Sequence, residues 1–469
     1  MAQAGAPSLA PRGPPCGRCA PPRAADPMAA AGSGERKKVV VIGGGVSSKH
    51  TVEELVKDKT IEVVMIQACS FVEWPLAMTS VLSNPTLHTK ALAPDPAKFQ
   101  VKGAAYIYGV VAGVDAKAKE IKLADAEAPV KYDALVVATG FRMPLFYPKP
   151  GATLAARRQE VAEAGAAIGK AACVGIGGGG VIGLELAGDI RVAYPTKRIV
   201  VFCRDTLLSN YPADFLDKVR VELQKRKIEV VEGCKKEPMH EVSLEQRTVS
   251  HEGTDYCCDV FIPAFLQGPN TSFLGDSEPS SGKGLLDEAG KVVVNDRLQC
   301  PSAPEIFAVG VSTAGGFVGI AKLQDQWTAV ARNVKAILSG KPLKPMKESM
   351  KNMQRPPYLL VGRGKGGWAM WDISQLPPPL QCCCCCGMGG FPFCPPPCCW
   401  PCCGPCACGM CGCPSSGEGP ARCMGGLDFF SSSLHFKGVG QDAALAEQAA
   451  PAQESMGSKE AWSGANAPQ

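Results

Sequence analysis

The sequence predicts an α/β fold in which two Rossmann-like dinucleotide-binding domains, the second inserted in the first, precede a low-complexity tail. Two glycine-rich turns carry this prediction. The first turn, at residues 43–45, follows an apolar strand at 39–42, and the second, at 177–180, follows one at 171–176. Short apolar runs alternate with helical patterns around both turns, as in parallel α/β units. One such turn is a common accident, whereas two in one chain predict two dinucleotide sites.

The first unit begins with the buried strand at 39–42. A helix is expected over 51–58, a second strand over 61–66, and a third strand at 135–137 that ends in the tight turn Ala138-Thr139-Gly140. These apolar runs, separated by a helical pattern, indicate a parallel sheet.

The second unit repeats this pattern. Its expected strands lie at 171–176, 198–203, 228–231 and 260–262, and its expected helices run through Leu186 and Ile190 and over 214–225. Later in the chain, residues 291–308 are strand-like and 323–338 are helical. Pro342 and Pro345 follow and are expected to end that helix.

The expected domain boundaries follow these patterns and the changes in composition. They give an extension at 1–35, a first part of an FAD-binding domain at 36–150, an NAD(P)H-binding domain at 151–275, a second part of the FAD-binding domain at 276–340, a C-terminal region at 341–375, and a Cys/Pro-rich low-complexity tail at 376–469.

Composition narrows the class of protein. The chain has 469 residues, enough for two or three domains, and its net charge of +5 is too small to indicate a nucleic-acid partner. No run of 18 apolar residues is present, so a transmembrane helix is not expected. Of the 24 cysteines, 15 lie between Cys382 and Cys423, and the other nine show no pairing pattern, which indicates a reducing compartment. The five histidines are too dispersed for a metal site or a catalytic triad.

The extension at 1–35 allows two interpretations. It is rich in Ala, Pro and Gly, contains three arginines, and has no acidic residue before Asp26, as in a transit peptide. Its prolines interrupt the amphipathic helix that such a peptide needs, which favours a disordered extension. A cytoplasmic location is expected, with organelle targeting left open.

The second glycine turn has the residues that a dinucleotide site requires. In a strand–turn–helix site, the first glycine forms the tight turn, the second admits the pyrophosphate, and the third lets the helix pack on the strand. Gly178, Gly180 and Gly183 occupy these positions. The next strand ends in Cys203-Arg204 where an acidic residue is usual. The Arg204 guanidinium suits a 2′-phosphate, and Asp205 follows it, so both NADPH and NADH remain open.

The first glycine turn matches the pattern in part. Gly43 and Gly45 are present and Gly44 lies between them, but the third position is Ser48. The next strand ends in Gln67, where an acidic residue usually binds the ribose hydroxyls. Gln67 can hydrogen-bond to a ribose and Ser48 to a phosphate, although both arrangements are weaker.

Several motifs in their order along the chain resemble the FAD/NAD(P)-dependent pyridine nucleotide-disulfide-type oxidoreductase superfamily. The motifs are the two glycine turns, Ala138-Thr139-Gly140, Gly183-Leu184-Glu185, and Ile306-Phe307-Ala308-Val309-Gly310. The stretches 187–201 and 292–299 are most similar to its apoptosis-inducing-factor-like (ferroptosis suppressor protein-like) branch. The resemblance covers residues 37–370.

This resemblance implies a non-covalent FAD, NAD(P)H as the electron donor, and a quinone as the acceptor at a membrane surface. The residues implied to contact FAD are Gly43, Gly44, Gly45, Ser47, Ser48, Gln67, Thr139, Gly140, Gly310 and Val311. Those implied to contact NAD(P)H are Gly178, Gly180, Gly183 and Arg204. Glu185 is implied to lie where nicotinamide meets flavin, and Lys149 lies near the position of a family lysine. Hydride passes directly between stacked rings in such enzymes, so no acid or base is obligatory.

Departures from the family pattern concentrate on the flavin side. The late motif ends Gly310-Val311 where the family has Gly-Asp, Met78 replaces an expected arginine, and Ala264-Phe265-Leu266 replaces a second Ala-Thr-Gly. Each lost hydrogen-bonding group costs ~1–3 kcal/mol. Two hypotheses follow: an FAD-dependent NAD(P)H oxidoreductase, and a flavin-free NAD(P)H-binding sensor or interaction protein.

The cysteine tract has three interpretations. Multiple S-palmitoylation would give peripheral membrane association, since two or more acyl chains anchor a protein stably. Metal binding has candidate pairs at Cys403/Cys406 and Cys408/Cys411, but the spacing is irregular and no histidine is near. The third is low-complexity sequence without a role. The interleaved Phe391, Phe393 and Trp400 favour the membrane. The sequence does not determine the oligomeric state.

Overall fold

The structure is a computed structural model of the whole chain. It describes residues 36–93, 100–209, 211–235, 238–275, 277, 284–314, 320–347, 358–362, 368–371 and 416–417.

The first sheet is parallel and has the strand order β16-β9-β1-β2-β5. Its strands are β1 (Lys37–Ile42), β2 (Ile61–Gln67), β5 (Ala104–Tyr108), β9 (Ala134–Val137) and β16 (Ile306–Ala308). The last of these comes from late in the chain and pairs with β9, Ala308 opposite Val137. The chain therefore leaves this sheet, builds a second sheet, and returns to complete the first, as the predicted insertion requires.

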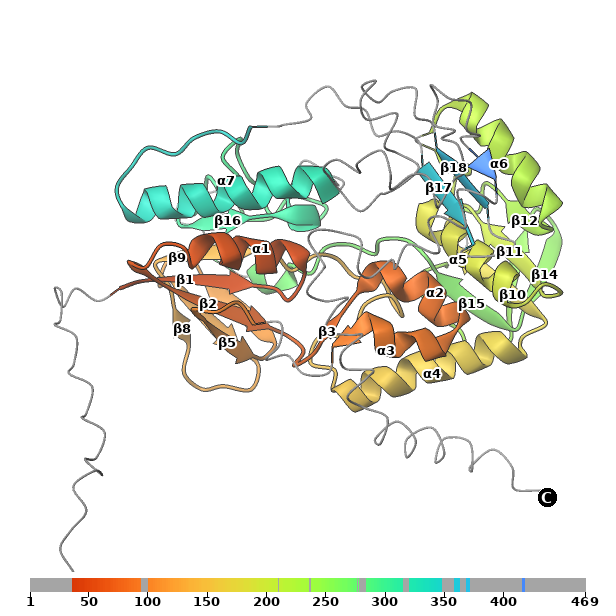
Figure 1. Cartoon of the computed structure of the whole chain (residues 1–469), viewed down its shortest axis with the longest axis horizontal. Coiled ribbons are helices and arrows are strands. Elements are labelled where there is room, and N and C mark those ends of the chain that lie inside the picture. The colour runs from red at the N-terminus through yellow and green to blue at the C-terminus, as the bar shows by residue number, and fades with distance from the viewer. Residues whose placement is uncertain are drawn as a thin grey trace, which may run out of the picture. The chain divides into compact units, whose positions relative to one another are not determined.

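Different layers cover the two faces of this sheet. Helices α1 (Val46–Leu55) and α7 (Ile320–Leu338) lie together on one face, where His50 stacks on Trp327 with ring centroids 4.6 Å apart (Figure 1). The side chains of the opposite face form a core with Ile121 and Val114 of an antiparallel sheet made of β6 (Val111–Asp115), β7 (Glu120–Leu123) and β8 (Val130–Lys131). Burial on both faces explains why the central strands are almost entirely apolar.

The second sheet is also parallel, with the order β12-β11-β10-β15. Its strands are β10 (Cys173–Gly177), β11 (Arg198–Phe202), β12 (Ile228–Val231) and β15 (Val260–Pro263), and its helices are α4 (Leu154–Lys170), α5 (Val181–Ala193) and α6 (Ala213–Lys225). Gly188 of α5 packs so closely on β17 (Tyr358–Val361) that a Cβ there would lie 2.1 Å from the amide nitrogen of Gly362.

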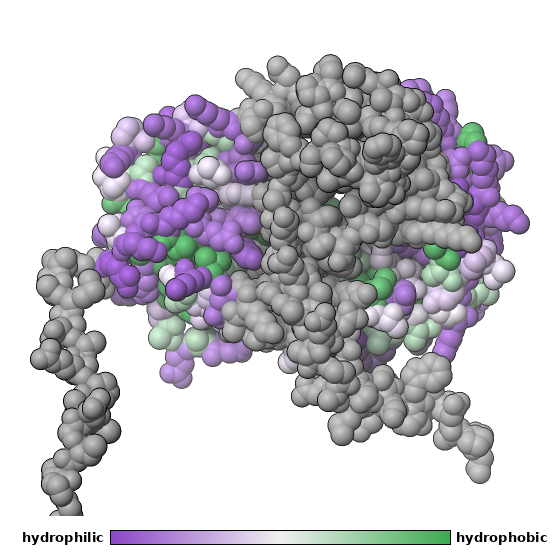
Figure 2. All heavy atoms as spheres, in the orientation of Figure 1, coloured by the Kyte–Doolittle hydropathy of each residue, from purple (hydrophilic) through white to green (hydrophobic). Residues whose placement is uncertain are grey.

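Smaller elements complete the fold. They are β3 (Val72–Glu73), β4 (Leu92–Ala93), α2 (Met78–Ser83), α3 (His88–Ala91), the antiparallel hairpin β13 (Arg247–His251) and β14 (Thr254–Cys258), the strands β18 (Trp368–Trp371) and β19 (Ser416–Gly417), and the 3₁₀ turns η1 (Pro75–Ala77), η2 (Pro85–Leu87), η4 (Ser272–Leu274) and η5 (Gly310–Ser312). In the view of Figure 2, the described surface is largely hydrophilic, with separate hydrophobic residues.

Two expected elements need correction. The strand-like stretch 291–308 is a strand only at Ile306–Ala308, and the part before it consists of turns and isolated bridges such as Gln299 with Phe307. The helix expected over 51–58 is α1, which begins at Val46 directly after Gly45. Its buried residues include Ser48 and Thr51, whose polarity hides the helical period.

A buried ion cluster ties α4 to β3. The Arg157 guanidinium is fully buried and donates to both carboxylate oxygens of Glu73, with Nη2 at 2.8 Å from Oε2. The same Nη2 donates to the Leu145 carbonyl, and the ring of His88 lies 2.7 Å from the other Glu73 oxygen. Burial acts to raise the pKa of Glu73, but hydrogen bonds from His88 and Arg157 hold that pKa below its ordinary value of 4.5.

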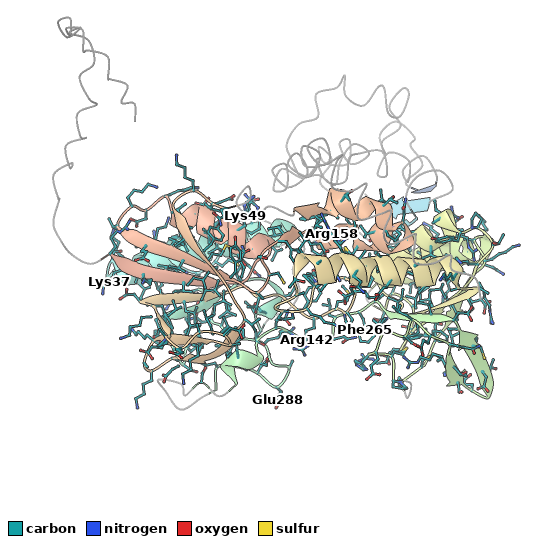
Figure 3. The ribbon with its side chains drawn as sticks, turned by 90° about the horizontal axis from the view of Figure 1, so that it is seen from below. Lys37, Lys49, Arg142, Arg158, Phe265 and Glu288 are labelled. Carbon is teal, nitrogen blue, oxygen red and sulfur yellow. The ribbon has the colours of Figure 1, made fainter. Side chains whose placement is uncertain are left out.

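We expect Glu73→Gln to lower the free energy of unfolding by about 3 kcal/mol, because it leaves a buried guanidinium without its main partner. Arg158, the exposed next residue on the same helix and labelled in Figure 3, provides the control, and Arg158→Met should change stability by less than about 0.5 kcal/mol. Urea denaturation at several pH values measures both. Since the folded pKa of Glu73 is lowered, its contribution is present at pH 7 and is lost progressively as pH falls below the ordinary value of 4.5 and through the lower folded pKa. Equal effects of the two variants would contradict the assignment.

Candidate functional site

The first glycine turn is fixed by close contact with the neighbouring strands of its sheet. The Gly43 amide donates to the Ile66 carbonyl at 2.9 Å, and the Gly43 backbone has a φ of +134°. A Cβ on Gly43 would lie 2.3 Å from the carbonyl oxygen of Ala138, which follows β9. Only glycine fits this position, so Gly43 is required by the fold itself.

The second glycine turn repeats this geometry. The Gly178 amide donates to the Phe202 carbonyl at 2.7 Å, φ is +122°, and a Cβ would lie 3.0 Å from the Ala264 carbonyl oxygen. Phe202 therefore corresponds to Ile66 of the first turn. By the same correspondence, the residue after Phe202, Cys203, occupies the place of Gln67.

Gly45 and Gly180, in contrast, are not required by the fold. Each is the N-cap of the following helix, with extended backbone angles that any residue adopts: φ −88° and ψ −173° at Gly45, φ −85° and ψ −178° at Gly180. A Cβ at either position would meet no atom within 4 Å. Neither helix has a side-chain cap or an acidic residue in its first turn. Each turn therefore leaves open space beside uncapped N–H groups, the arrangement that admits a phosphate.

The third position differs between the two turns. A Cβ on Gly183 would lie 1.9 Å from the Gly178 carbonyl oxygen, so this position needs glycine. Ser48 occupies it in the first turn, where it is fully buried and donates its hydroxyl to the Ala138 carbonyl at 3.2 Å. The serine thus replaces a steric fit with an internal hydrogen bond, which commits its hydroxyl to the fold.

The predicted ribose-side residues lie next to their turns. Gln67 ends β2 in a buried position, and its side chain lies 3.5 Å from where a Gly44 Cβ would project. In the second site, Cys203 is buried against Gly179, and burial raises the pKa of its thiol to about 12. Arg204 is exposed one residue later, and its Nε lies 3.0 Å from the carboxylate of Asp205.

The remaining predicted FAD residues gather beside the first turn. A Cβ on Gly310 would lie 3.3 Å from the Ser47 hydroxyl, which places the late motif against the start of α1. The Gly310 amide donates to the Gln326 side chain at 2.7 Å, and Val311 is half-buried in η5. The hydroxyl oxygen of Thr139 is buried without a hydrogen-bond partner among the described residues, which marks a polar atom available to a bound group.

Two chain segments that pass between the sheets pair beside Thr139. Phe141 and Pro269 form an antiparallel bridge, and the Asn270 side chain donates to the Thr139 carbonyl at 3.2 Å. The guanidinium of Arg142, a residue labelled in Figure 3, donates to the carbonyls of Gln267 and Pro269, at 3.0 and 2.8 Å. Gly140, with φ of +68°, allows the chain to turn into this pairing.

Two further candidates, Glu185 and Lys149, lie in the segments that follow or precede the second turn. Glu185 is half-buried in the first turns of α5. Lys149 is exposed, and its backbone carbonyl accepts hydrogen bonds from the Cys69 thiol and the Ala152 amide. The sequence identified Thr139 from its motif but did not identify Gln326, because no local pattern signals the contact of its side chain with the Gly310 amide. Within the described ranges, no group of three metal-ligating side chains is found, and no helix is long and apolar enough to cross a membrane. The cysteine tract lies outside the described residues apart from 416–417.

The chain is similar to known proteins over most of its described length. The family model for pyridine nucleotide-disulphide oxidoreductases matches residues 37–329. The chain is 24% identical to Oxidoreductase ptaL of Pestalotiopsis fici over 346 residues, 70% of this chain and 90% of that protein. It is 24% identical to Apoptosis-inducing factor homolog A of Dictyostelium discoideum over 308 residues, 59% of this chain and 71% of that protein.

The fold also resembles solved structures. The sulfide:quinone oxidoreductase of Aquifex aeolicus superposes with a TM-score of 0.53 at 18% identity, covering 73% of this chain and 85% of that chain. This likeness shows the shared fold.

The two kinds of glycine should respond differently to alanine. We expect Gly183→Ala to lower the free energy of unfolding by about 1–3 kcal/mol, because its Cβ would overlap the Gly178 carbonyl. Gly180→Ala, three residues earlier in open space, should change stability by less than about 1 kcal/mol. Thermal unfolding of the two variants tests the contrast. Equal losses would show that the open space at Gly180 is not present in solution.

Proposed function

This chain belongs to the pyridine nucleotide-disulphide oxidoreductase family, and from that premise we propose that it is an FAD-dependent NAD(P)H oxidoreductase whose acceptor is a quinone. FAD, when bound, takes a hydride from NAD(P)H and passes the electrons to the acceptor. The observation that carries the proposal is the pair of open N-cap glycines, Gly45 and Gly180, each beside an uncapped helix N-terminus. Neither glycine is needed for folding, and both leave room for a pyrophosphate.

The residues of the first turn fit FAD. The open N–H groups after Gly45 would bind the pyrophosphate, and the Gln67 amide would bind the adenosine ribose. The Thr139 hydroxyl, which is buried without a partner among the described residues, would also hydrogen-bond with the cofactor. The full set proposed for FAD is Gly43, Gly44, Gly45, Ser47, Ser48, Gln67, Thr139, Gly140, Gly310 and Val311. Within it, Ser48 acts by packing, since its hydroxyl bonds to Ala138.

The second turn would bind NAD(P)H through Gly178, Gly180 and Gly183, with Arg204 at the ribose side. Gly178 and Gly183 set the path of the backbone, and Gly180 keeps the approach to the helix N-terminus clear. Glu185, which follows on the same helix, would lie toward the nicotinamide. Lys149, which lies near the position of a family lysine, has an exposed side chain, so any role in the reaction would be at the protein surface.

A quinone acceptor is favoured over a disulfide. Reduction of a disulfide by the dithiol route needs two cysteines beside the flavin, and residues 36–150 contain Cys69 alone. The similarity to the apoptosis-inducing-factor-like branch also points to a quinone. A lipidated cysteine tract would hold the enzyme at the membrane where apolar quinones reside.

The visible absorption spectrum tests the cofactor assignment. The purified protein should show a flavin band that bleaches when NADPH or NADH is added without oxygen. Gly180→Trp should keep the band and prevent the bleaching, whereas the matched variant Gly45→Trp should lose the band. The indole would fill the open space at one turn without disturbing the other.

The contrary outcomes are distinct. A colourless protein that FAD cannot reconstitute would support the alternative, a flavin-free NAD(P)H-binding protein. The neutral residues Gln67 and Val311, at positions where acidic residues are usual, motivate that alternative. Normal bleaching in Gly180→Trp would refute the donor site.

The acceptor is tested with the holoprotein and a soluble short-chain quinone. We expect NAD(P)H oxidation to rise at least about tenfold on adding the quinone, and not on adding an aromatic disulfide. The reverse preference would replace the quinone assignment and leave the flavin and donor sites in place.

A further inference from the structure

Two cations flank one carboxylate at the ribose side of the second turn. Arg204 Nε lies 3.0 Å from Oδ2 of Asp205, and Lys235 Nζ lies 3.3 Å from Oδ1 of the same side chain. The side chains of Arg204 and Lys235 are 78% and 70% exposed, so an anionic ligand can reach both. These two hydrogen bonds and the charges lower the pKa of Asp205, which keeps it ionised. The cluster carries a net charge of +1 from two cations and one anion.

Backbone hydrogen bonds hold these residues beside the glycine turn. The Leu208 amide donates to the Gly179 carbonyl at 2.9 Å, which fixes the loop after β11 to the turn. The Gly233 amide donates to the Asp205 carbonyl at 2.8 Å, and the Cys234 amide to the Cys203 carbonyl at 2.9 Å. The loop after β12 that carries Lys235 is therefore attached to the loop that carries Arg204.

A second carboxylate in these loops is already committed. Glu232 accepts the Leu207 amide at 2.6 Å and the Arg220 guanidinium at 2.8 Å. Burial acts to raise the pKa of Glu232, but these hydrogen bonds hold it below its ordinary value. Glu232 therefore stabilises the loop, and its charge is balanced by Arg220. The charged side chains that remain for a ligand at this strand end are those of Arg204, Asp205 and Lys235.

The position that an acidic residue occupies in an NADH site is uncharged here. Cys203 corresponds to that position, lies against Gly179, and has a thiol pKa raised to about 12 by burial. It supplies no carboxylate for the ribose hydroxyls. Asp205 is the nearest alternative, but both of its oxygens are engaged by cations.

We propose that Lys235 and Arg204 form a two-cation subsite for the 2′-phosphate of NADPH, and that Asp205 is an internal anion that the phosphate displaces. The inference rests on the proposed donor site at the second turn and adds Lys235 and Asp205 to it. A dianionic phosphate attracts the two cations more strongly than one carboxylate does, and it offers more acceptor oxygens. Asp205 lowers the affinity for the phosphate while it keeps the two side chains in place.

Binding of two adenosine fragments to the full-length protein tests the subsite directly, because it does not depend on flavin or turnover. Adenosine 2′,5′-bisphosphate carries the 2′-phosphate, and 5′-AMP lacks it. We expect Lys235→Met to weaken binding of the bisphosphate about tenfold and to leave 5′-AMP binding within about twofold. Lys225→Met removes a cation of similar exposure from α6 in the same domain and should change neither affinity.

Asp205→Asn provides the opposite change. It removes the competing anion and should tighten bisphosphate binding several-fold, with little effect on 5′-AMP. The wild-type preference for the bisphosphate should also shrink between low salt and about 0.5 M salt, because exposed charges are screened. Isothermal titration calorimetry measures all of these affinities.

The outcomes separate the subsite from the proposed function. If wild type binds both fragments equally, or Lys235→Met weakens both alike, the two-cation subsite is refuted while the donor site stands. If wild type binds neither fragment, the donor site of the proposed function fails, and the subsite fails with it. Tighter bisphosphate binding in Lys235→Met would also overturn the assignment.

Discussion

Both candidate cofactor sites depend on one steric constraint, the close approach of a strand–helix turn to a carbonyl of a neighbouring strand. A Cβ on Gly43 would lie 2.3 Å from the Ala138 carbonyl oxygen and would overlap it, and a Cβ on Gly178 would lie in tight contact with the Ala264 carbonyl oxygen, at 3.0 Å. Gly43 and Gly178 both have a positive φ, which turns the chain so that the next helix packs on the sheet with its first N–H groups uncapped. The position of each helix N-terminus, and so the place where a pyrophosphate would bind, follows from this contact.

The two turns solve the same packing problem in different ways. At the second turn, the helix approaches so closely that Gly183 is the only residue that fits. At the first, Ser48 is accommodated because its hydroxyl finds the Ala138 carbonyl, the acceptor that also excludes a Cβ at Gly43. The flavin-side departures at Ser48 and Gln67 are therefore neutral, hydrogen-bonding substitutions that keep the backbone of the turn. That backbone, more than the side chains, presents N–H groups to a pyrophosphate.

The sequence predicts those parts of the fold that local patterns determine. Strands β1, β2, β11 and β12 were placed within about two residues, because buried parallel strands are continuous apolar runs between turn residues. The antiparallel pairs β6–β7 and β13–β14 were not predicted, since their strands are short and partly exposed. The glycine positions could be predicted because the turns that require them are short sequence motifs between a strand and a helix. The Glu73–Arg157 pair and Lys235 beside Asp205 join residues distant in the chain, and no spacing reports such contacts.

The ribose sides of the two sites give a reason for their different ligands. Neither strand end carries a free carboxylate: Gln67 is a neutral amide and Cys203 is a buried thiol. A neutral amide both donates and accepts hydrogen bonds, so Gln67 would suit the hydroxyls of the unphosphorylated ribose of FAD. At the second site the buried Cys203 thiol cannot bind the ribose hydroxyls. The choice between NADPH and NADH would then depend on the exposed cations Arg204 and Lys235, through their charge. Under the proposed assignments, two sites with the same backbone geometry would differ in selectivity through the residues at the end of the second strand of each unit and in the loops beyond it.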